Sequence, residues 1–231
     1  MRNTTSNSPV IFISGGTGIG TSTLAYSLVP IVGAHALIGT DSIRQILRSL
    51  SDKYTPEEQL YLKASSFAVH NKISFDNNLS LEDRIIYGYQ RQSEIVMKSA
   101  LAVAYRALSE GYPLILEGVH ISYKILSQLI KMNCCNLYNL RKRFFKVFLH
   151  CEDATQHMKH FFNDVKHSSR DSTSTYTNDK NWGAIRIIQN NLHKESKRNR
   201  IHSILDNGKY QQYEVVEKFA KDYFLWKSNL I

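Results

Sequence analysis

Cysteine, proline and long apolar runs are all scarce in this sequence of 231 residues. Two of the three cysteines, Cys134 and Cys135, are adjacent, which is a poor arrangement for a disulfide framework, so we expect free thiols in a reducing compartment. No apolar run approaches the ~20 residues that a membrane helix needs. The polar start, residues 1–9, lacks the apolar core of a signal peptide. The sequence therefore predicts a cytoplasmic protein that does not enter a membrane.

Acidic residues are outnumbered by basic ones, 20 against 29, so the chain carries a formal charge of +9. A basic chain can bind nucleic acid, anionic lipid or small phosphorylated ligands. The basic residues are dispersed, apart from two clusters at Arg141–Arg143 and Lys194–Arg200, and each cluster can equally be a solvated helix face. Charge alone therefore identifies no partner, and nucleic-acid binding is the less favoured reading.

Short apolar runs alternate with helical patterns along the chain, which is typical of a parallel sheet with right-handed crossovers. We expect five strands, at Val10–Ser14, Ala34–Gly39, Pro113–Leu116, Phe145–His150 and Ile201–Leu205. We expect helices at Thr21–Val29, Asp41–Leu50, from Thr55-Pro56, at Ser80–Glu110, Ala154–Lys166, Gly183–Arg200 and Gln212–Trp226. The polar segment His167–Asn181 reads as a mobile loop. Residues 1–9 would form a flexible tail and residues 10–231 one α/β domain with a helical insertion and a lid.

A glycine-rich segment follows the first expected strand and precedes the first expected helix. It matches the phosphate-binding pattern G-x-x-x-x-G-K-[ST], with Gly15 and Gly20 at the glycine positions and Ser22 at the hydroxyl position. Successive backbone N–H groups and the helix start favour an anion there, and Ser22 would ligate Mg²⁺. The residues expected to hold ATP phosphates are Gly15, Gly16, Thr17, Gly18, Ile19, Gly20, Thr21, Ser22 and Thr23. The fold class expected is therefore the three-layer P-loop NTPase fold with a mostly parallel five-stranded sheet.

The loop departs from the pattern at Thr21, where a lysine normally neutralises the β- and γ-phosphates. Either another cation compensates, or the site binds nucleotide without fast turnover. A dinucleotide fold is excluded by spacing, because G-x-G-x-x-G would require a glycine at position 21.

Two carboxylates follow expected strands, where open α/β sheets bind their ligands. Asp41 could orient or deprotonate an acceptor hydroxyl, although a plain helix N-cap is the alternative. Arg44 shares its helix face and would suit an anionic group of the acceptor. Glu117 ends the third strand and could hold magnesium or orient the nucleophile. His120 could bind an anion, and a structural histidine is an equal reading.

Several strings of the sequence resemble the 2-phosphoglycerate kinase family, in the family's order between Val10 and Asp206. They are Ile13–Thr23, Ile38–Arg44, Gly88–Gln92, Leu116–His120 and Ile185–Gln189. The resemblance implies ATP- and Mg²⁺-dependent phosphorylation of 2-phosphoglycerate to 2,3-bisphosphoglycerate on a P-loop kinase fold. The segment His157–Phe161 departs from the family, which is usually richer in arginine there, and this puts the lid in doubt.

The resemblance implies roles for the glycine loop, Asp41, Arg44, Glu117, Arg91 and Arg186. The residue types themselves add His120 as an anion-binding candidate and Ser22 as a metal ligand. Catalytic roles fall to Asp41, Arg44, Glu117 and Arg186; substrate binding falls to Asp41, Arg44, Arg91 and His120; the metal would be held by Ser22 and Glu117. Candidate lid cations are Lys166, Arg170 and Arg186. Three alternatives stay open: a kinase for another small phosphorylated metabolite or nucleotide, a nucleotide-binding regulator with weak catalysis, and a nucleic-acid-binding protein.

Overall fold

The computed structural model describes residues 8–75, 78–132, 141–167, 179–205 and 212–229. Its centre is a sheet of five strands, all paired in parallel, in the order β2-β3-β1-β4-β5. The strands are β1 (Val10–Ser14), β2 (Ala36–Gly39), β3 (Leu114–Gly118), β4 (Phe144–His150) and β5 (His202–Leu205). The expected five-stranded parallel sheet is therefore confirmed.

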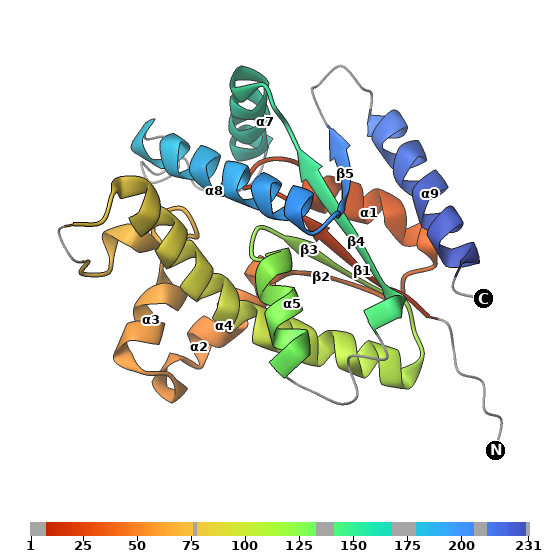
Figure 1. Ribbon diagram of the computed structural model, residues 1–231, viewed down its shortest axis with the longest axis horizontal. Helices are drawn as coiled ribbons and strands as arrows, with labels where there is room; N and C mark the ends of the chain where they lie inside the picture. Colours follow the sequence, from red (N-terminus) through yellow and green to blue (C-terminus); the bar gives the residue numbers. More distant parts are fainter. Residues whose placement is uncertain (1–7, 76–77, 133–140, 168–178, 206–211, 230–231) are drawn as a thin grey trace.

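Helices cover both faces of this sheet. They are α1 (Thr21–Val32), α2 (Thr40–Ser49), α3 (Pro56–Lys63), α4 (Leu81–Glu110), α5 (Tyr123–Met132), α7 (Ala154–His167), α8 (Asp179–Arg198) and α9 (Gln212–Ser228). Short 3-10 turns occupy Ser51–Lys53, Val69–Asn71 and Arg141–Arg143. Figure 1 shows α1 and α9 on one side of the sheet, with α4, α5 and α8 on the other. None of the helices described is long and apolar enough to cross a membrane.

The central strand β1 explains why the sheet is buried on both faces. All five of its residues are buried, and a continuous apolar run is what a strand covered on both sides requires. Val10 and Phe12 join the core formed with α4, α5 and α8, whereas Ile11 and Ile13 join the core formed with α1 and α9. The three-layer architecture follows from this alternation of side chains.

The parallel register places the ends of the strands together. Ser14, the last residue of β1, pairs with Gly118 of β3 on one side and lies opposite Phe148 of β4 on the other. Glu117 is therefore adjacent to the point where the glycine loop leaves β1. This edge of the sheet is where ligands bind in folds of this type.

Two helix boundaries differ from those expected by three residues or more. Helix α1 passes through Pro30 and ends at Val32, where Gly33 closes it at φ 64° by donating its N–H to Val29 O. Proline removes one helical N–H, whose acceptor would be the carbonyl of Tyr26, a residue 70% exposed, so water can take its place. Helix α8 begins at Asp179, so the last residues of the expected loop are helical; its residues 168–178 lie outside the described chain.

The start of α3 agrees with its sequence signature. Glu58 donates its backbone N–H to Thr55 Oγ1 at 3.3 Å, and the Glu58 carboxylate accepts the backbone N–H of Thr55 at 3.0 Å. This reciprocal capping box, with Pro56 in the first turn, fixes where α3 begins beside α2 and α4.

Candidate active site

The glycine loop connects β1 to α1 and depends on backbone conformations that favour glycine. Gly18 has φ 79° and Gly20 has φ 91°, both in the left-handed region. A Cβ added at Gly18 would lie 2.8 Å from Phe161 Cβ of α7. The loop therefore turns sharply and passes close to α7, which only glycine permits at position 18.

A cleft of about 180 Å³ opens above this loop at the carboxyl edge of the sheet. It is lined by Gly16, Thr17, Gly18, Gly20, Thr21, Ser22, Thr23, Asp41, Glu117, Gly118 and Val119. The structure thus brings Asp41 and Glu117 to the glycine loop, as the sequence predicted. Among these lining residues there are two carboxylates and no lysine or arginine.

Two residues of the predicted cradle do not line the cleft. Ile19 is 1% exposed and packs into the core formed with α1 and α9. Gly15 lies behind the loop, where a Cβ would be 2.5 Å from Ile19 Cγ2. An apolar side chain within the loop anchors it to the core, so Gly15 and Ile19 support the loop and do not face the cleft.

Glu117 is the polar centre of the cleft. Its carboxylate accepts a hydrogen bond from Thr21 Oγ1 at 2.7 Å and another from Ser22 Oγ at 3.1 Å. The side chain is 8% exposed, so it is held firmly at the end of β3. Thr21 therefore places a neutral hydroxyl against a carboxylate at the position where a lysine would neutralise phosphate.

Asp41 stands in the first turn of α2, across the cleft from the loop. Its side chain is 66% exposed, and its Oδ1 accepts from Arg44 Nε at 3.3 Å. Gly118 permits this approach of α2 to β3, because it has φ 129° and any Cβ there would collide with Thr40 Oγ1. The sequence pair Glu117-Gly118 thus supplies both a carboxylate and the space that brings Asp41 opposite it.

Arg44 does not line the cleft. Its guanidinium donates from Nη1 to Leu62 O at 3.3 Å and to Ala64 O at 2.9 Å, and the side chain is only 15% exposed. These contacts join α2 to the end of α3. They also fix the Arg44 side chain, which donates its Nε–H to the Asp41 carboxylate. The structure thus gives Arg44 a contact that positions Asp41, and its expected contact with an acceptor stays a prediction.

The expected anion-binding role of His120 does not agree with its surroundings. His120 is fully buried; its Nδ1 lies 3.1 Å from Thr40 Oγ1 and its Nε2 3.0 Å from Gln92 Oε1. Gln92 Nε2 donates to Ala64 O, so Gln92 Oε1 must accept from His120 Nε2–H, which leaves Nδ1 to accept from Thr40. Burial lowers the pKa of His120 to about 4. It is a neutral structural histidine that ties β3 to the start of α2.

Arg91 also lies elsewhere. It is on the exposed face of α4, paired with Glu94 at 2.7 Å, and borders a separate cavity of about 550 Å³ between α4 and α5. The loop cleft shares none of the residues lining that cavity. The structure therefore does not bring Arg91 to the glycine loop, and its role in substrate binding stays a prediction.

Arg186 contacts the glycine loop indirectly, through His157. Its Nη1 donates to Cys151 O at 3.0 Å and to His157 Nδ1 at 3.1 Å, and its Nη2 donates to Glu152 O at 3.1 Å. His157 Nε2 lies 2.9 Å from Thr17 O and must be the donor there. Arg186 is thus a positioning residue for the loop.

Of the other candidate lid cations, Arg170 lies outside the described residues, and Lys166 falls in the last turn of α7.

Two residues with direct contacts to the loop were missed by sequence reasoning. One is His157; the other is Gln189, which is 1% exposed and accepts the Gly16 N–H on its Oε1 at 2.6 Å. Gln189 follows Arg186 by three positions, so both face the loop from one side of α8. That spacing within Ile185–Gln189 was the available signal, whereas nothing around His157 distinguishes it from a surface histidine.

Two of the buried histidines, His120 and His157, predict an acid-sensitive fold. Burial lowers the pKa of both His120 and His157 from 6.5 to about 4. As the pH falls below 6.5 the unfolded chain binds these protons first, so stability that is complete above pH 6.5 is lost progressively down to about pH 4. Urea unfolding between pH 7 and pH 4 should show this decline. His157→Gln, which keeps a donor for Thr17, should make the decline shallower; an unchanged slope would contradict the assignment.

The chain is similar in sequence to known proteins of the family that it resembles. The match covers only part of the length of those proteins. The chain is 32% identical over 155 residues to the 2-phosphoglycerate kinase of Methanopyrus kandleri, covering 66% of this chain and 42% of that protein. It is 35% identical over 113 residues to that of Methanocaldococcus jannaschii, covering 48% and 34%. The chain thus spans less than half the length of these relatives. No protein-family model matches it.

Among solved structures, the chain is similar to a gluconokinase from Sinorhizobium meliloti 1021. The TM-score is 0.50 at 14% sequence identity, covering 96% of this chain and 95% of that chain. Identity this low shows the fold alone. Together with the parallel sheet and the loop between β1 and α1, it confirms the expected three-layer P-loop NTPase fold.

Proposed function

We propose that the chain is an ATP-dependent phosphotransferase acting on a small phosphorylated hydroxy acid, with 2-phosphoglycerate as the preferred acceptor and 2,3-bisphosphoglycerate as the product. The observation that carries this proposal is the meeting of Asp41 and Glu117 with the glycine loop in one cleft. The name shared by the sequence relatives supports the choice of acceptor. The cytoplasmic location stays a prediction.

The loop would hold the ATP phosphates through its backbone. Residues Gly16–Gly18 and Gly20–Thr23 line the cleft, and the start of α1 directs N–H groups and a positive dipole end towards it. Phosphoryl transfer depends on positioning and charge neutralisation, so the lack of a lysine at position 21 must be compensated. The described lining offers no side-chain cation for this purpose.

The donor atoms in the cleft fit Mg²⁺. Ser22 Oγ and the Glu117 carboxylate lie within 3.1 Å of each other, and Asp41 lines the same space. Hydroxyl, carboxylate and phosphate oxygens are the ligands that Mg²⁺ prefers. When bound, the ion would supply the positive charge next to the phosphates that Thr21 does not. Ser22 and Glu117 are the residues that would hold it.

Asp41 would bind and orient the hydroxyl group of the acceptor. Its exposed carboxylate faces the cleft from the first turn of α2, and Arg44 fixes its direction. From there it would accept a hydrogen bond from the acceptor hydroxyl, orient that oxygen in line with the γ-phosphorus and take up its proton.

The neutral Thr21 favours a second candidate, a nucleotide-binding regulator with weak catalysis. Labelled ATP, offered with 2-phosphoglycerate, 3-phosphoglycerate, sugar phosphates and nucleoside monophosphates, separates the candidates. We expect transfer to 2-phosphoglycerate above all others. Transfer to another acceptor would replace the substrate, and binding of ATP without any transfer would establish the regulator.

A further inference from the structure

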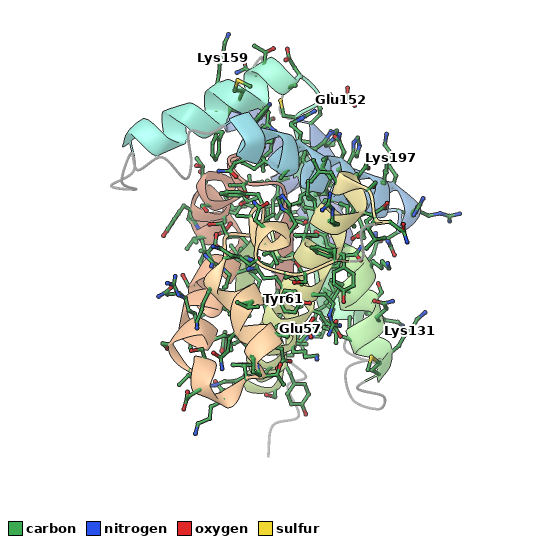
Figure 2. All side chains as sticks on the ribbon, turned by 90° about the vertical axis from the view of Figure 1, so that its left-hand side faces the viewer. Glu57, Tyr61, Lys131, Glu152, Lys159 and Lys197 are labelled. Carbon is green, nitrogen blue, oxygen red and sulfur yellow. The ribbon has the colours of Figure 1, made fainter. Side chains whose placement is uncertain are left out.

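Three metal-ligating side chains converge at the carboxyl end of β4, outside the loop cleft. They are His150, the last residue of β4, Glu152 two positions on, and His193 from α8. One ligand atom from each lies within 4.8 Å of the other two. The imidazole rings of His150 and His193 are 4.2 Å apart between centroids, at 33° to each other. Figure 2 labels Glu152 in the same upper part of the molecule as Lys197 of α8.

The cluster contains a buried nitrogen that lacks a partner. His150 is 7% exposed, and its Nδ1 makes no hydrogen bond within the part of the chain that the structure describes. An unpaired polar atom in such a place costs stability, and native folds normally satisfy it. A cation held by this nitrogen together with His193 and Glu152 would satisfy it.

The donor set selects the kind of ion. Two imidazole nitrogens and one carboxylate oxygen suit Zn²⁺ and related first-row ions, whereas Mg²⁺ and Ca²⁺ prefer oxygen alone. Tetrahedral zinc with bonds of about 2.0–2.1 Å holds its ligand atoms about 3.4 Å apart, so small side-chain rotations close the site. Glu152 is exposed and His193 half-buried, which leaves a fourth position open to water.

We propose that His150, Glu152 and His193 form a zinc site that is separate from the proposed Mg²⁺ site. The ion would connect the end of β4 to α8. The carbonyl groups of Cys151 and Glu152 at that same turn accept hydrogen bonds from Arg186, which also contacts His157 behind the loop. Zinc would therefore reinforce the junction on which the loop contacts of α8 depend.

Positively charged side chains near the cluster limit its affinity for zinc. One of them provides a control variant. Lys197 and Lys218 lie close enough to His150 to act on its charge state. Each also repels a divalent ion, while Glu152 attracts it. Removing the charge of Lys197, one turn beyond His193 on α8, should therefore strengthen zinc binding without altering any ligand.

The test is calorimetric titration of the full chain with ZnCl₂ in excess Mg²⁺. Cys134→Ser and Cys135→Ser are introduced throughout, because adjacent thiols would bind zinc themselves. We expect one equivalent to bind and the midpoint of thermal unfolding to rise. Glu152→Gln and His193→Gln should each weaken binding by at least about 10-fold. Glu214→Gln, an exposed carboxylate on α9, should not change it, and Lys197→Gln should strengthen it.

The variants Glu152→Gln and His193→Gln change exposed or half-buried positions, so both should fold, which their unfolding midpoints without zinc verify. Equal zinc affinity in both variants and in the parent would overturn the proposal. So would a parent chain that binds no zinc. Neither result would affect the proposed phosphotransferase, since transfer is assayed with Mg²⁺ alone.

Discussion

Replacing Asp41 by asparagine should lower the rate of phosphoryl transfer by about 10²–10⁴-fold, the usual contribution of a general base. Asparagine has nearly the same shape but cannot take up the proton of the acceptor hydroxyl. ATP affinity should stay almost intact, because the phosphates are assigned to the backbone of the glycine loop. The fold should persist, since the side chain is 66% exposed and Arg44 keeps its bonds to Leu62 O and Ala64 O. Steady-state kinetics and ATP titration measure both effects.

The matched control for Asp41 is Asp52→Asn. Asp52 is equally exposed, lies just beyond α2 and pairs only with Lys53 among the described ion pairs. It should leave turnover unchanged. Unchanged turnover in Asp41→Asn itself would remove Asp41 from the proposed role. It would not make Asp41 the N-cap considered as the alternative, because Gly39 is the N-cap of α2 and Asp41 lies in the first turn.

The substitution Glu117→Gln should have the second large effect, on the metal. The neutral amide keeps the size of the side chain but loses the charge that would hold Mg²⁺, and its NH₂ group would face the hydroxyl of Thr21 or Ser22. Metal stabilisation of a transferring phosphoryl group amounts to several kcal/mol, so the rate should fall at least about 100-fold. The Mg²⁺ concentration needed for half-maximal rate should rise.

Because Glu117 is 8% exposed, its variant needs a check of folding by thermal unfolding. The control is Glu110→Gln, at the far end of α4, where the carboxylate pairs with Arg106 on the surface. That change should leave the Mg²⁺ dependence as it is. An unaltered Mg²⁺ requirement in a folded Glu117→Gln protein would show that another group holds the ion.

The sheet and the carboxylates could be predicted because their physical causes are local in the sequence. The continuous apolar run Val10–Ser14 can be covered only on both faces, which indicates a central parallel strand. Asp41 and Glu117 each follow an expected strand, and the carboxyl ends of parallel strands share one edge. Their meeting with the glycine loop therefore required no knowledge of the tertiary packing.

The cationic and imidazole groups could not be assigned in this way, because orientation decides their roles. Arg91 and Gln92 are neighbours in the sequence, yet about 100° of helical rotation exposes one and buries the other. His120 follows Glu117 by three residues, but the turn after Gly118 directs its ring into the core. Arg44 shares the helix face of Asp41, as expected. Its guanidinium, however, donates hydrogen bonds to the backbone carbonyl groups of Leu62 and Ala64, at the end of α3.

Helix α5 and the full length of α1 show a further limit of local patterns. Tyr123–Met132 forms a helix that the sequence reading did not include, with buried side chains such as Leu126 and Leu129. Tertiary packing against α4 and α8 completes it. At Pro30, an exposed surface allowed a helix to continue where proline normally predicts an end.

We propose the cleft between the glycine loop, Asp41 and Glu117 as the place where the γ-phosphoryl group of ATP is transferred. The most direct test of this proposal is incubation of the chain with γ-labelled ATP, Mg²⁺ and 2-phosphoglycerate, with Asp41→Asn in parallel. We expect labelled 2,3-bisphosphoglycerate from the parent chain and a strongly reduced yield from the variant. Bound ATP with no labelled product from any acceptor, or equal yields from both proteins, would contradict it.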